Sequence, residues 1–241
     1  MTREPELGQP IDFNASGVSK RLDAFARLIR VSGEHLLDVG CGNGAYTLAM
    51  ANSFERVDAI DVEPVRIAAL SEEVAERGLQ STFSVHLMSA ADLAFADGTF
   101  DVVTAIEVLE HLPDLPRSLA EVRRVMRDDG VLLVTVPNRL FPLETHSVVV
   151  AGRRFPGRRL PFLPYVPPLH ARWSEARTFT TRTLAATMRA AGFAPSATTH
   201  VMPPFDRWSN GRRVLKPVTD RLEASPLAAF GVSIVMACRK Q

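Results

Sequence analysis

The chain has 241 residues, of which 46% are hydrophobic and 23% are charged, and its formal net charge is +1. This composition is ordinary for a globular protein, and the length suits one α/β domain with insertions, which we expect to span residues 1–241. Two cysteines exclude a disulfide framework, and the longest apolar run, residues 227–238, is too short for a membrane span. The polar residues 1–6 predict no secretory signal, so we expect a cytoplasmic protein.

Residues 1–15 are predicted to form a loose arm that precedes a helix. Ser19 is a suitable cap for this helix, which has Leu22, Phe25 and Ile29 on one apolar face and is expected to end near Gly33. The apolar run 36–39 then predicts a strand that is buried on both faces. Three alternating glycines follow it, and residues 46–50 predict the start of a second helix.

The segment from this strand to residue 61 indicates a ligand site. Glycines at the turn let the backbone bend sharply and let a ligand approach closely. Asp38 lies inside the apolar strand, where an unpaired carboxylate is costly. Asp61 ends the next predicted strand, residues 57–60, about 20 residues after Gly40, where a nucleotide-binding βαβ unit places its ribose carboxylate. The alternative is a tight turn without a ligand, which would not account for both carboxylates.

Two ligands are compatible with the glycines. Gly40-x-Gly42-x-x-Ala45 fits the dinucleotide fingerprint of nicotinamide and flavin enzymes. A pyrophosphate at the helix N-terminus would be disfavoured by Asp38, whereas the ammonium and sulfonium of S-adenosylmethionine would be favoured. At this point the chain resembles the class I S-adenosylmethionine-dependent methyltransferases. Residues 38–44 match their D-x-G-x-G-x-G motif at every fixed position.

Further segments extend this resemblance, which is dense over residues 34–138. A helix is expected from Pro64 to Gly78 and a strand over residues 82–88. Residues 89–101 resemble the family's G-D-A-x-x-L-P-F-x-D-x-x-F-D signature, with Ser89 in place of the Asp that accepts a hydrogen bond from adenine. After a strand at 101–106, residues 107–114 resemble the E-x-x-E-H-x-x-D segment of the members that modify quinones, lipids and natural products.

The resemblance implies a doubly wound, mostly parallel sheet of seven strands. A helix is expected from residue 114 until Asp128-Asp129-Gly130 breaks it, and the fifth strand over residues 131–136. A helix at 181–191, a strand at 193–201 and an antiparallel last strand at 230–237 complete the fold. The strand–helix alternation independently predicts a parallel sheet that is covered on both faces.

Two basic insertions interrupt the second half of the chain. We name residues 139–178 the cover segment, which contains seven arginines against two glutamates, mixed with prolines and aromatic residues. The other insertion spans residues 203–226 and is expected to be partly helical. Connections at the C-terminal ends of parallel strands emerge over the ligand crevice, so both insertions are predicted to crowd one rim of the site. Their composition favours an apolar or lipid-like acceptor with an anionic part, or contact with a membrane surface.

The resemblance also assigns roles to individual residues. Asp61 is expected to bind the ribose hydroxyls, Val62 to lie against the adenine, and Asp38 to favour the ammonium through water. His111 is a candidate general base from its position just past the strand at 101–106, and the alternative is that it caps the turn before Pro113. The remaining cofactor-binding residues are expected to be Gly40, Cys41, Gly42, Asn43, Gly44, Ser89, Ala90, Ala91 and Glu107. His146 and His170 are interpreted as rim or packing residues. No metal site is predicted, because histidines and carboxylates do not cluster at ligand spacing.

These features predict an S-adenosylmethionine-dependent methyltransferase of a small acceptor, most consistent with O-methylation. One alternative is an RNA methyltransferase, because arginines with aromatics also bind single strands. Nucleic acid is disfavoured, since the chain has no overall basic bias. The other alternative is a non-catalytic protein that binds S-adenosylmethionine, which a fold alone does not exclude.

Overall fold

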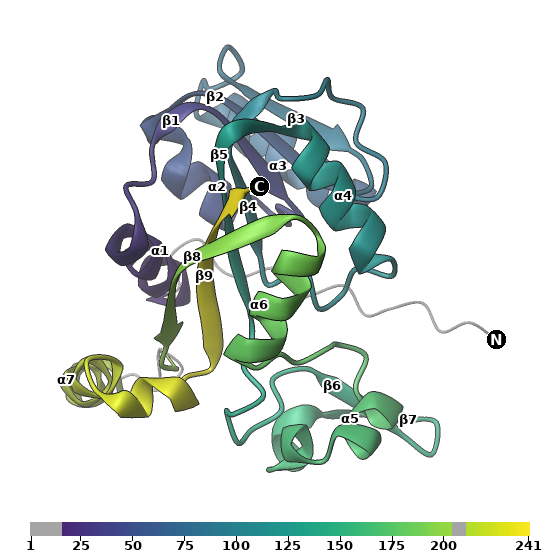
Figure 1. Cartoon of the computed structure of the whole chain (residues 1–241), viewed down its shortest axis with the longest axis vertical. Coiled ribbons are helices and arrows are strands. Elements are labelled where there is room, and N and C mark those ends of the chain that lie inside the picture. Colours follow the sequence, from purple (N-terminus) through teal and green to yellow (C-terminus); the bar gives the residue numbers. More distant parts are fainter. Residues whose placement is uncertain (1–15, 204–210) are drawn as a thin grey trace.

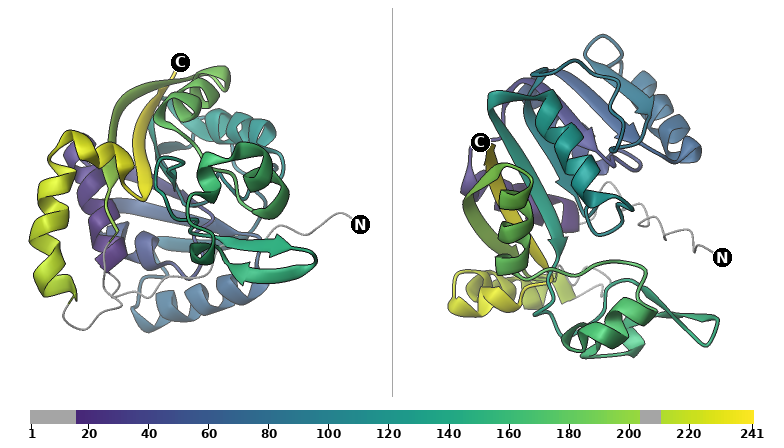
Figure 2. Two further views of the ribbon diagram at one scale, coloured as in Figure 1. Left: turned by 90° about the horizontal axis from the view of Figure 1, so that it is seen from below. Right: turned by 45° about the vertical axis from the view of Figure 1, so that its right-hand side comes forward.

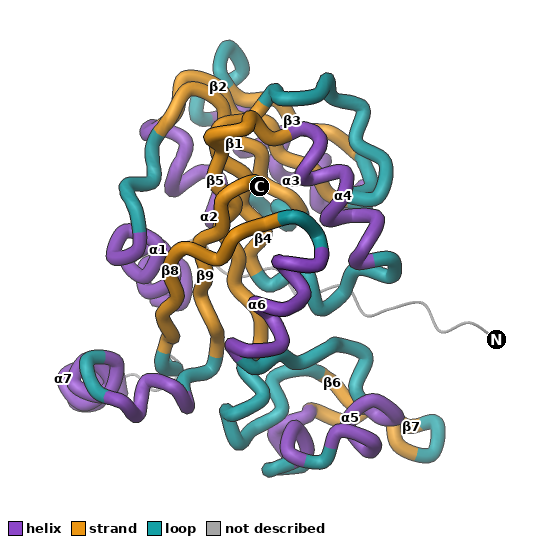
Figure 3. Tube along the Cα trace, viewed as in Figure 1, coloured by secondary structure: helices purple, strands orange, loops and turns teal. Residues whose placement is uncertain are grey.

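The computed structural model describes residues 16–203 and 211–241, and the arm expected at residues 1–15 lies outside them. Its main sheet has seven strands (Figures 1 and 3). In chain order they are β1 (Gly33–Val39), β2 (Phe54–Asp61), β3 (Phe83–Leu87), β4 (Phe100–Ile106), β5 (Met126–Pro137), β8 (Phe193–Val201) and β9 (Ser233–Lys240).

The strands follow the order β3-β2-β1-β4-β5-β9-β8. The pairs from β3 to β5 are parallel, whereas β9 is antiparallel to both of its neighbours. The chain order reverses between β1 and β4, and ligands of doubly wound sheets bind at such a switch point. The prediction of a seven-stranded, mostly parallel, doubly wound sheet is therefore confirmed.

Helices cover both faces of the sheet. The face that holds Leu36 packs against α1 (Ser16–Leu28), α2 (Ala45–Met50) and α3 (Pro64–Glu76). The face that holds Leu37 packs against α4 (Leu115–Val125) and α6 (Thr181–Ala190). Because side chains alternate across a strand, the unbroken apolar run of β1 supplies both cores at once. This burial fixes the register at which β1 delivers the following glycines to the C-terminal edge.

Several element boundaries differ from the sequence prediction. Helix α1 begins at Ser16 and ends at Leu28, so Ser19 lies inside it and is not its cap. Strand β5 begins at Met126, and the expected helix breaker Asp128-Asp129-Gly130 lies within it. The pairing of β5 with β4 shifts register there, and a Cβ on Gly130 would meet the Phe100 carbonyl oxygen at 3.3 Å. The glycine thus permits a close approach of two backbones at a bulge.

The cover segment is folded and projects beyond the end of β5 (Figures 1 and 2). It contains the hairpin β6 (Ser147–Val150) and β7 (Arg153–Pro156), short 3₁₀ turns and α5 (Pro167–Trp173). Arg177 ties its end to the loop after β4, since its backbone N–H donates to the Glu110 carbonyl and its guanidinium to the Leu112 carbonyl. This attachment places the cover segment beside the C-terminal edge of the sheet.

The second insertion occupies a different place from the one predicted. Its helix α7 (Gly211–Glu223) lies beside α1 in Figure 1, where Lys20 forms an ion pair of 2.9 Å with Glu223. The described part of residues 203–226 contributes nothing to the cavity below, so the expectation that both insertions crowd one rim is wrong for it. Within the described ranges, no helix combines the length and the apolar character that crossing a membrane requires.

Candidate cofactor and acceptor site

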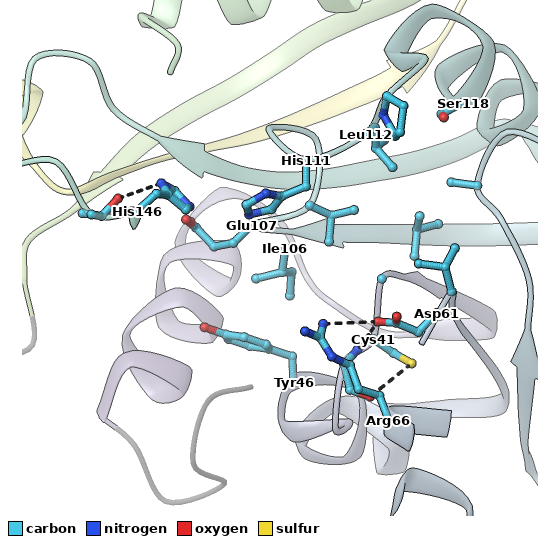
Figure 4. Close-up of a pocket in the computed structure, with 18 of the residues that line it drawn as sticks. Cys41, Tyr46, Asp61, Arg66, Ile106, Glu107, His111, Leu112, Ser118 and His146 are labelled. Atoms are coloured by element: carbon cyan, nitrogen blue, oxygen red, sulfur yellow. Dashed lines mark hydrogen bonds and ion pairs between the residues drawn. The ribbon is translucent and has the colours of Figure 1, made fainter. Parts of the chain in front are cut away.

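A cavity of about 1080 Å³ opens at the C-terminal ends of β1, β2 and β4. One side is made by residues 40–43 of the glycine loop, which is defined here as residues 40–44, with Asp61 and Arg66. The other side is made by residues 107–113 and the cover segment. Figure 4 shows Cys41, Asp61 and Arg66 on the first side, and Glu107, His111 and His146 on the second. The cavity therefore joins the segment expected to bind a cofactor to the segment expected to cover it.

The glycine loop forms a tight turn in which the glycines have left-handed backbone conformations. The backbone N–H groups of Gly40 and Cys41 both donate to the Ile60 carbonyl, at 2.8 and 2.9 Å. Gly40 has a φ of +72°, and a Cβ there would lie 2.4 Å from a Val108 methyl carbon. Side chains rarely adopt this φ, and this one would also overlap Val108. The loop backbone consequently forms the floor of the cavity.

Asp38 lies beneath the loop and does not line the cavity. Its carboxylate accepts hydrogen bonds from the hydroxyls of Thr47 and of Thr104, the latter at 2.7 Å. Burial raises the pKa of Asp38 to about 6, and the threonine hydrogen bonds oppose this rise only in part. Asp38 thus joins β1, α2 and β4 through its oxygens, and its expected effect on the ammonium, which would act from beneath the loop, stays a prediction.

Asp61 remains at the cavity wall, as the sequence predicts. One carboxylate oxygen accepts from the Gly42 N–H at 2.9 Å, and the other from the Glu63 N–H at 3.0 Å. Arg66 lies 3.8 Å from the carboxylate. The side chain is 5% exposed and faces the cavity (Figure 4). Asp61 thus both fixes the glycine loop and presents a negatively charged acceptor to a ligand.

Arg21 and Glu107 form an ion pair at the inner end of the cavity. The closest approach is 3.3 Å, and Glu107 also accepts from the Thr135 hydroxyl at 2.9 Å. Burial raises the pKa of Glu107, but the Arg21 charge and the hydrogen bonds from Thr135 and Ser233 together outweigh burial, so the pKa lies below its ordinary value. Arg21 was not identified from the sequence, although a signal exists: it is three residues after the buried Val18 and four before the buried Phe25.

Glu110, His111 and His146 come together on the acceptor side. Each offers one possible ligand atom, and these atoms lie within 4.8 Å of one another. The statement that histidines and carboxylates do not cluster is therefore wrong, since His146 arrives from the cover segment, 35 residues after His111 in sequence. A set of two imidazoles and a carboxylate has the composition of a transition-metal site.

The pKa values in this group are shifted by burial. Both Glu110 oxygens are buried without a hydrogen-bond partner, and burial, followed by the nearby Glu107 charge, raises the pKa of Glu110 well above its usual range. Burial also lowers the pKa of His111 to about 4, with His146 adding to the effect. The two imidazole rings lie 5.1 Å apart, edge to face. His111 is consequently neutral at physiological pH, and the same burial makes it a weak base.

Glu144 organises the cover segment around His146. Its carboxylate accepts from the His146 backbone N–H at 2.8 Å and contacts His170 Nε2 at 2.6 Å. Burial raises the pKa of Glu144, but the hydrogen bonds from His146 and His170 outweigh burial and lower it to about 2. Glu144 was not identified from the sequence, because its partners are histidines of separate elements. His170 is a buried packing residue, as interpreted, whereas His146 faces the cavity.

The remaining assigned residues mostly reach the cavity. Val62 lines it with its side chain half exposed, and the Ser89 hydroxyl accepts from the Ala91 N–H at 3.2 Å. Gly44 does not line the cavity; it packs against Leu70. The predicted residues that the structure brings to the cavity are Gly40, Cys41, Gly42, Asn43, Asp61, Val62, Ser89, Ala90, Ala91, Glu107 and His111.

The strand order and the glycine loop define a class I methyltransferase fold, and residues 37–134 match the family described as Methyltransferase domain. The resemblance stated from the sequence is confirmed by this match. Among solved structures, an S-adenosylmethionine-dependent methyltransferase from Mesorhizobium loti is 17% identical with a TM-score of 0.63, over 93% of this chain and 99% of that one. The [4+2]-cyclase SpnF is 22% identical with the same TM-score, over 100% of this chain and 88% of that one.

The curated relatives are more similar in sequence but match only part of the chain. A ubiquinone biosynthesis O-methyltransferase of Xanthomonas oryzae pv. oryzae is 34% identical over 146 residues, which is 58% of this chain and 58% of that protein. A nocamycin O-methyltransferase of Saccharothrix syringae is 40% identical over 135 residues, which is 52% of this chain and 47% of that protein. The chain thus spans between about half and three fifths of the curated relatives it matches.

Proposed function

We propose that the protein is an S-adenosylmethionine-dependent methyltransferase that methylates an oxygen of a small, largely apolar acceptor. The observation that carries this proposal is the cavity between the glycine loop and the cover segment, with Asp61 on its wall. The match of residues 37–134 to a methyltransferase family supports the class of reaction. Both curated relatives are named O-methyltransferases, which supports oxygen as the atom that is methylated.

The donor is assigned to the side of the cavity that holds the glycine loop. Asp61 would accept hydrogen bonds from both ribose hydroxyls, and Val62 with residues 89–91 would contact the adenine. Arg21 is buried beside the inner end of the cavity, and it would attract the donor's carboxylate. The backbone of residues 40–43 leaves room for the methionyl part because its glycines carry no Cβ. Glu107 would act through Arg21, whose guanidinium it orients.

The acceptor is assigned to the side formed by residues 107–113 and the cover segment. The bound donor supplies a methyl group that is already activated by its sulfonium. The protein's task is therefore to align the acceptor oxygen, to exclude water and to receive the proton that this oxygen loses. His111 would take that proton while the new carbon–oxygen bond forms, because it lines the cavity and is neutral above about pH 4.

We also propose that the cover segment contacts an anionic membrane surface and that the protein acts in the cytoplasm. Phe162 is 58% exposed, and Tyr165, Val166 and Leu169 beside it are also exposed. The Phe162 N–H donates to the Pro142 carbonyl, and so places these side chains next to the cavity-lining stretch at 141–143. Aromatic and aliphatic side chains next to arginines suit the boundary between headgroups and acyl chains.

Two alternatives are distinguished by experiment. An RNA methyltransferase would bind RNA with an affinity that falls steeply with salt. A non-catalytic binder would bind the donor without transferring its methyl group, which the fold alone does not exclude.

The test is calorimetry followed by a transfer assay. We expect S-adenosylmethionine and its demethylated product to bind, and NADH not to bind. Methyl-labelled donor incubated with a panel of phenolic and carboxylic acceptors should label an apolar member of the panel. Tight binding of NADH with neither methyl-donor form bound would refute the proposal. Donor binding without labelling of any acceptor would favour the non-catalytic alternative.

A further inference from the structure

Arg158 is a cation of the cavity lining that has no ionic partner among the described residues. The four carboxylates of the lining each have a defined partner among the described residues: Asp61 has Gly42 and Glu63, Glu107 has Arg21, Asp114 has the Arg117 N–H, and Glu144 has His170. The two other arginines of the lining, Arg21 and Arg66, face Glu107 and Asp61. Across residues 16–203 and 211–241, no carboxylate forms an ion pair with Arg158.

The backbone that carries Arg158 is fixed against the acceptor side of the cavity. Arg158 lies in a 3₁₀ turn, residues 157–159, directly after β7. The preceding Gly157 is buried, and a Cβ at this position would lie 2.0 Å from the His146 carbonyl oxygen and 2.3 Å from Glu144 Cγ. Glu144 is itself buried and bound to His170. Arg158 is therefore held next to His146, on the side opposite the glycine loop.

Arg158 is exposed, so it can pair with an anion at the cavity without first losing its own hydration. The lining on this side also contains the apolar residues Leu112, Phe141, Leu143 and Pro156, which would contact the apolar part of a ligand. The planar guanidinium matches the two oxygens of a carboxylate in a bidentate pair. A single cation balances one carboxylate, whereas a phosphate dianion would retain an unbalanced charge.

We propose that Arg158 is a specificity-determining residue that binds a carboxylate of the acceptor. This inference rests on the proposed methyltransferase function and narrows its substrate class to an apolar molecule with one carboxylate. The carboxylate binds at the mouth of the cavity, the apolar body lies along Phe141 and Leu143, and the reacting oxygen points toward His111. Methylation occurs at this oxygen, and the carboxylate on Arg158 is left unmodified.

The experiment compares two matched probes, a 3-alkyl-4-hydroxybenzoate and its methyl ester, on protein saturated with the demethylated donor. Arg158→Ala should weaken binding of the carboxylate probe about 3- to 10-fold and change binding of the ester less than about twofold, as expected for one lost bidentate pair at an exposed position. Arg158→Lys should recover part of the affinity, because lysine keeps the positive charge but cannot form the bidentate hydrogen bonds of the guanidinium. Arg159→Ala is the matched control, since Arg159 is the next residue, is exposed and does not line the cavity.

The outcomes separate this inference from the proposed function. Equal loss of affinity for both probes, an unchanged affinity for the carboxylate, or no binding of either probe to the wild type would overturn the role of Arg158. Weaker binding of the demethylated donor to Arg158→Ala would also overturn it, because the arginine would then serve the donor. The proposed function is checked independently by the heat of donor binding and by methyl transfer to uncharged acceptors, neither of which requires Arg158.

Discussion

Two aspartates at the ends of neighbouring strands have different tasks in this protein. Asp38 on β1 is buried beneath the glycine loop and bonded to two threonine hydroxyls. Asp61 on β2 receives two backbone N–H groups and still faces the cavity. The difference follows from position, since Asp61 is the last residue of its strand and Asp38 precedes the end of its own. Substitution of the two residues should therefore affect different properties.

Asp61→Ala should weaken binding of S-adenosylmethionine by more than about tenfold. The proposed ribose contacts are hydrogen bonds to a charged acceptor, each worth about 1.5–3 kcal/mol, and the Gly42 N–H also loses its partner. Calorimetry measures the affinity, and circular dichroism verifies the fold. Asp92→Ala is a suitable control, because Asp92 is exposed and lies outside the cavity lining. Wild-type affinity in a folded Asp61→Ala variant would place the ribose elsewhere.

Asp38→Asn should change how stability depends on pH. The folded-state pKa of about 6 lies above the ordinary value of 3.8, so the native state binds this proton more tightly than the unfolded state does. The resulting contribution to the free energy of unfolding is fully present below about pH 4 and is lost as the pH rises to about 6.

Urea unfolding at several pH values measures this effect. Relative to the wild type, Asp38→Asn should gain about 3 kcal/mol of unfolding free energy between pH 4 and pH 7, since each pKa unit corresponds to about 1.4 kcal/mol. A constant difference between the two proteins across this range would contradict the burial of an ionisable group at this position.

At the scale of residues, the sequence predicted contacts that are local or tied to a motif. Asp61 was identified because its distance from Gly40 is set by one helix and one strand. The role of Asp38 was not identified from the sequence, because it depends on Thr104 from β4, which is 66 residues away in sequence. The pairing of Glu144 with His170 was missed for the same reason, as it joins two parts of the cover segment that have no periodic pattern.

Among the structural elements, the turn between β1 and α2 depends on its glycines in unequal ways. Gly40 has both a positive φ and the Val108 side chain in the space of a Cβ. Gly42 has a φ of +57°, but a Cβ added at Gly42 would have no other described atom within 4 Å. The first position is thus restricted by conformation and by packing, and the second by conformation alone.

Gly40→Ala and Gly42→Ala form a matched pair for testing the loop. Gly42→Ala should cost about 1 kcal/mol of unfolding free energy, from the left-handed backbone. Gly40→Ala should cost about 3 kcal/mol, because the overlap with Val108 adds the cost of overpacking. Thermal and urea unfolding provide the comparison. Equal effects of the two substitutions would show that packing against Val108 is unimportant, and a second variant, Gly40→Ala with Val108→Ala, should recover part of the loss.

Element types were predicted more accurately than element boundaries. The strands of the parallel half were found because each is an apolar run between turn residues. The start of β5 was misplaced, since Asp128-Asp129-Gly130 has the composition of a helix end and a bulge leaves no separate signal in composition. The hairpin β6–β7 was also missed, because each strand has only four residues and the two arginines of β7 obscure any alternation there.

The molecule has two parts: the main sheet, with the cavity at its C-terminal edge, and the cover segment, which exposes basic and apolar side chains. Residues 139–178 hold the exposed Phe162 and Tyr165, whose rings lie 5.8 Å apart. The described part of the second insertion packs beside α1 and lies away from this surface. Composition predicted that both insertions were basic, but their positions depend on tertiary contacts that composition does not encode.

Replacement of both Phe162 and Tyr165 by Ala tests the outward surface of the cover segment. The wild type should sediment with vesicles of anionic phosphatidylglycerol, and the double variant should sediment several-fold less, because it buries less apolar area at the bilayer. Donor affinity should not change. Val65→Ala is the matched control, since Val65 is an exposed apolar residue of α3. Equal sedimentation of the wild type and the double variant would refute the proposed membrane contact.

The position of β9 has a consequence for how the protein forms during translation. β9 leaves the ribosome after all the other strands, yet it lies between β5 and β8. Until β9 is available, β8 has no neighbour in the sheet, and β5 exposes an unpaired edge of backbone donors and acceptors. The parallel half can therefore assemble before β9 is synthesised, whereas the sheet closes only once β9 is available, and the edge of β5 needs protection from aggregation during that interval.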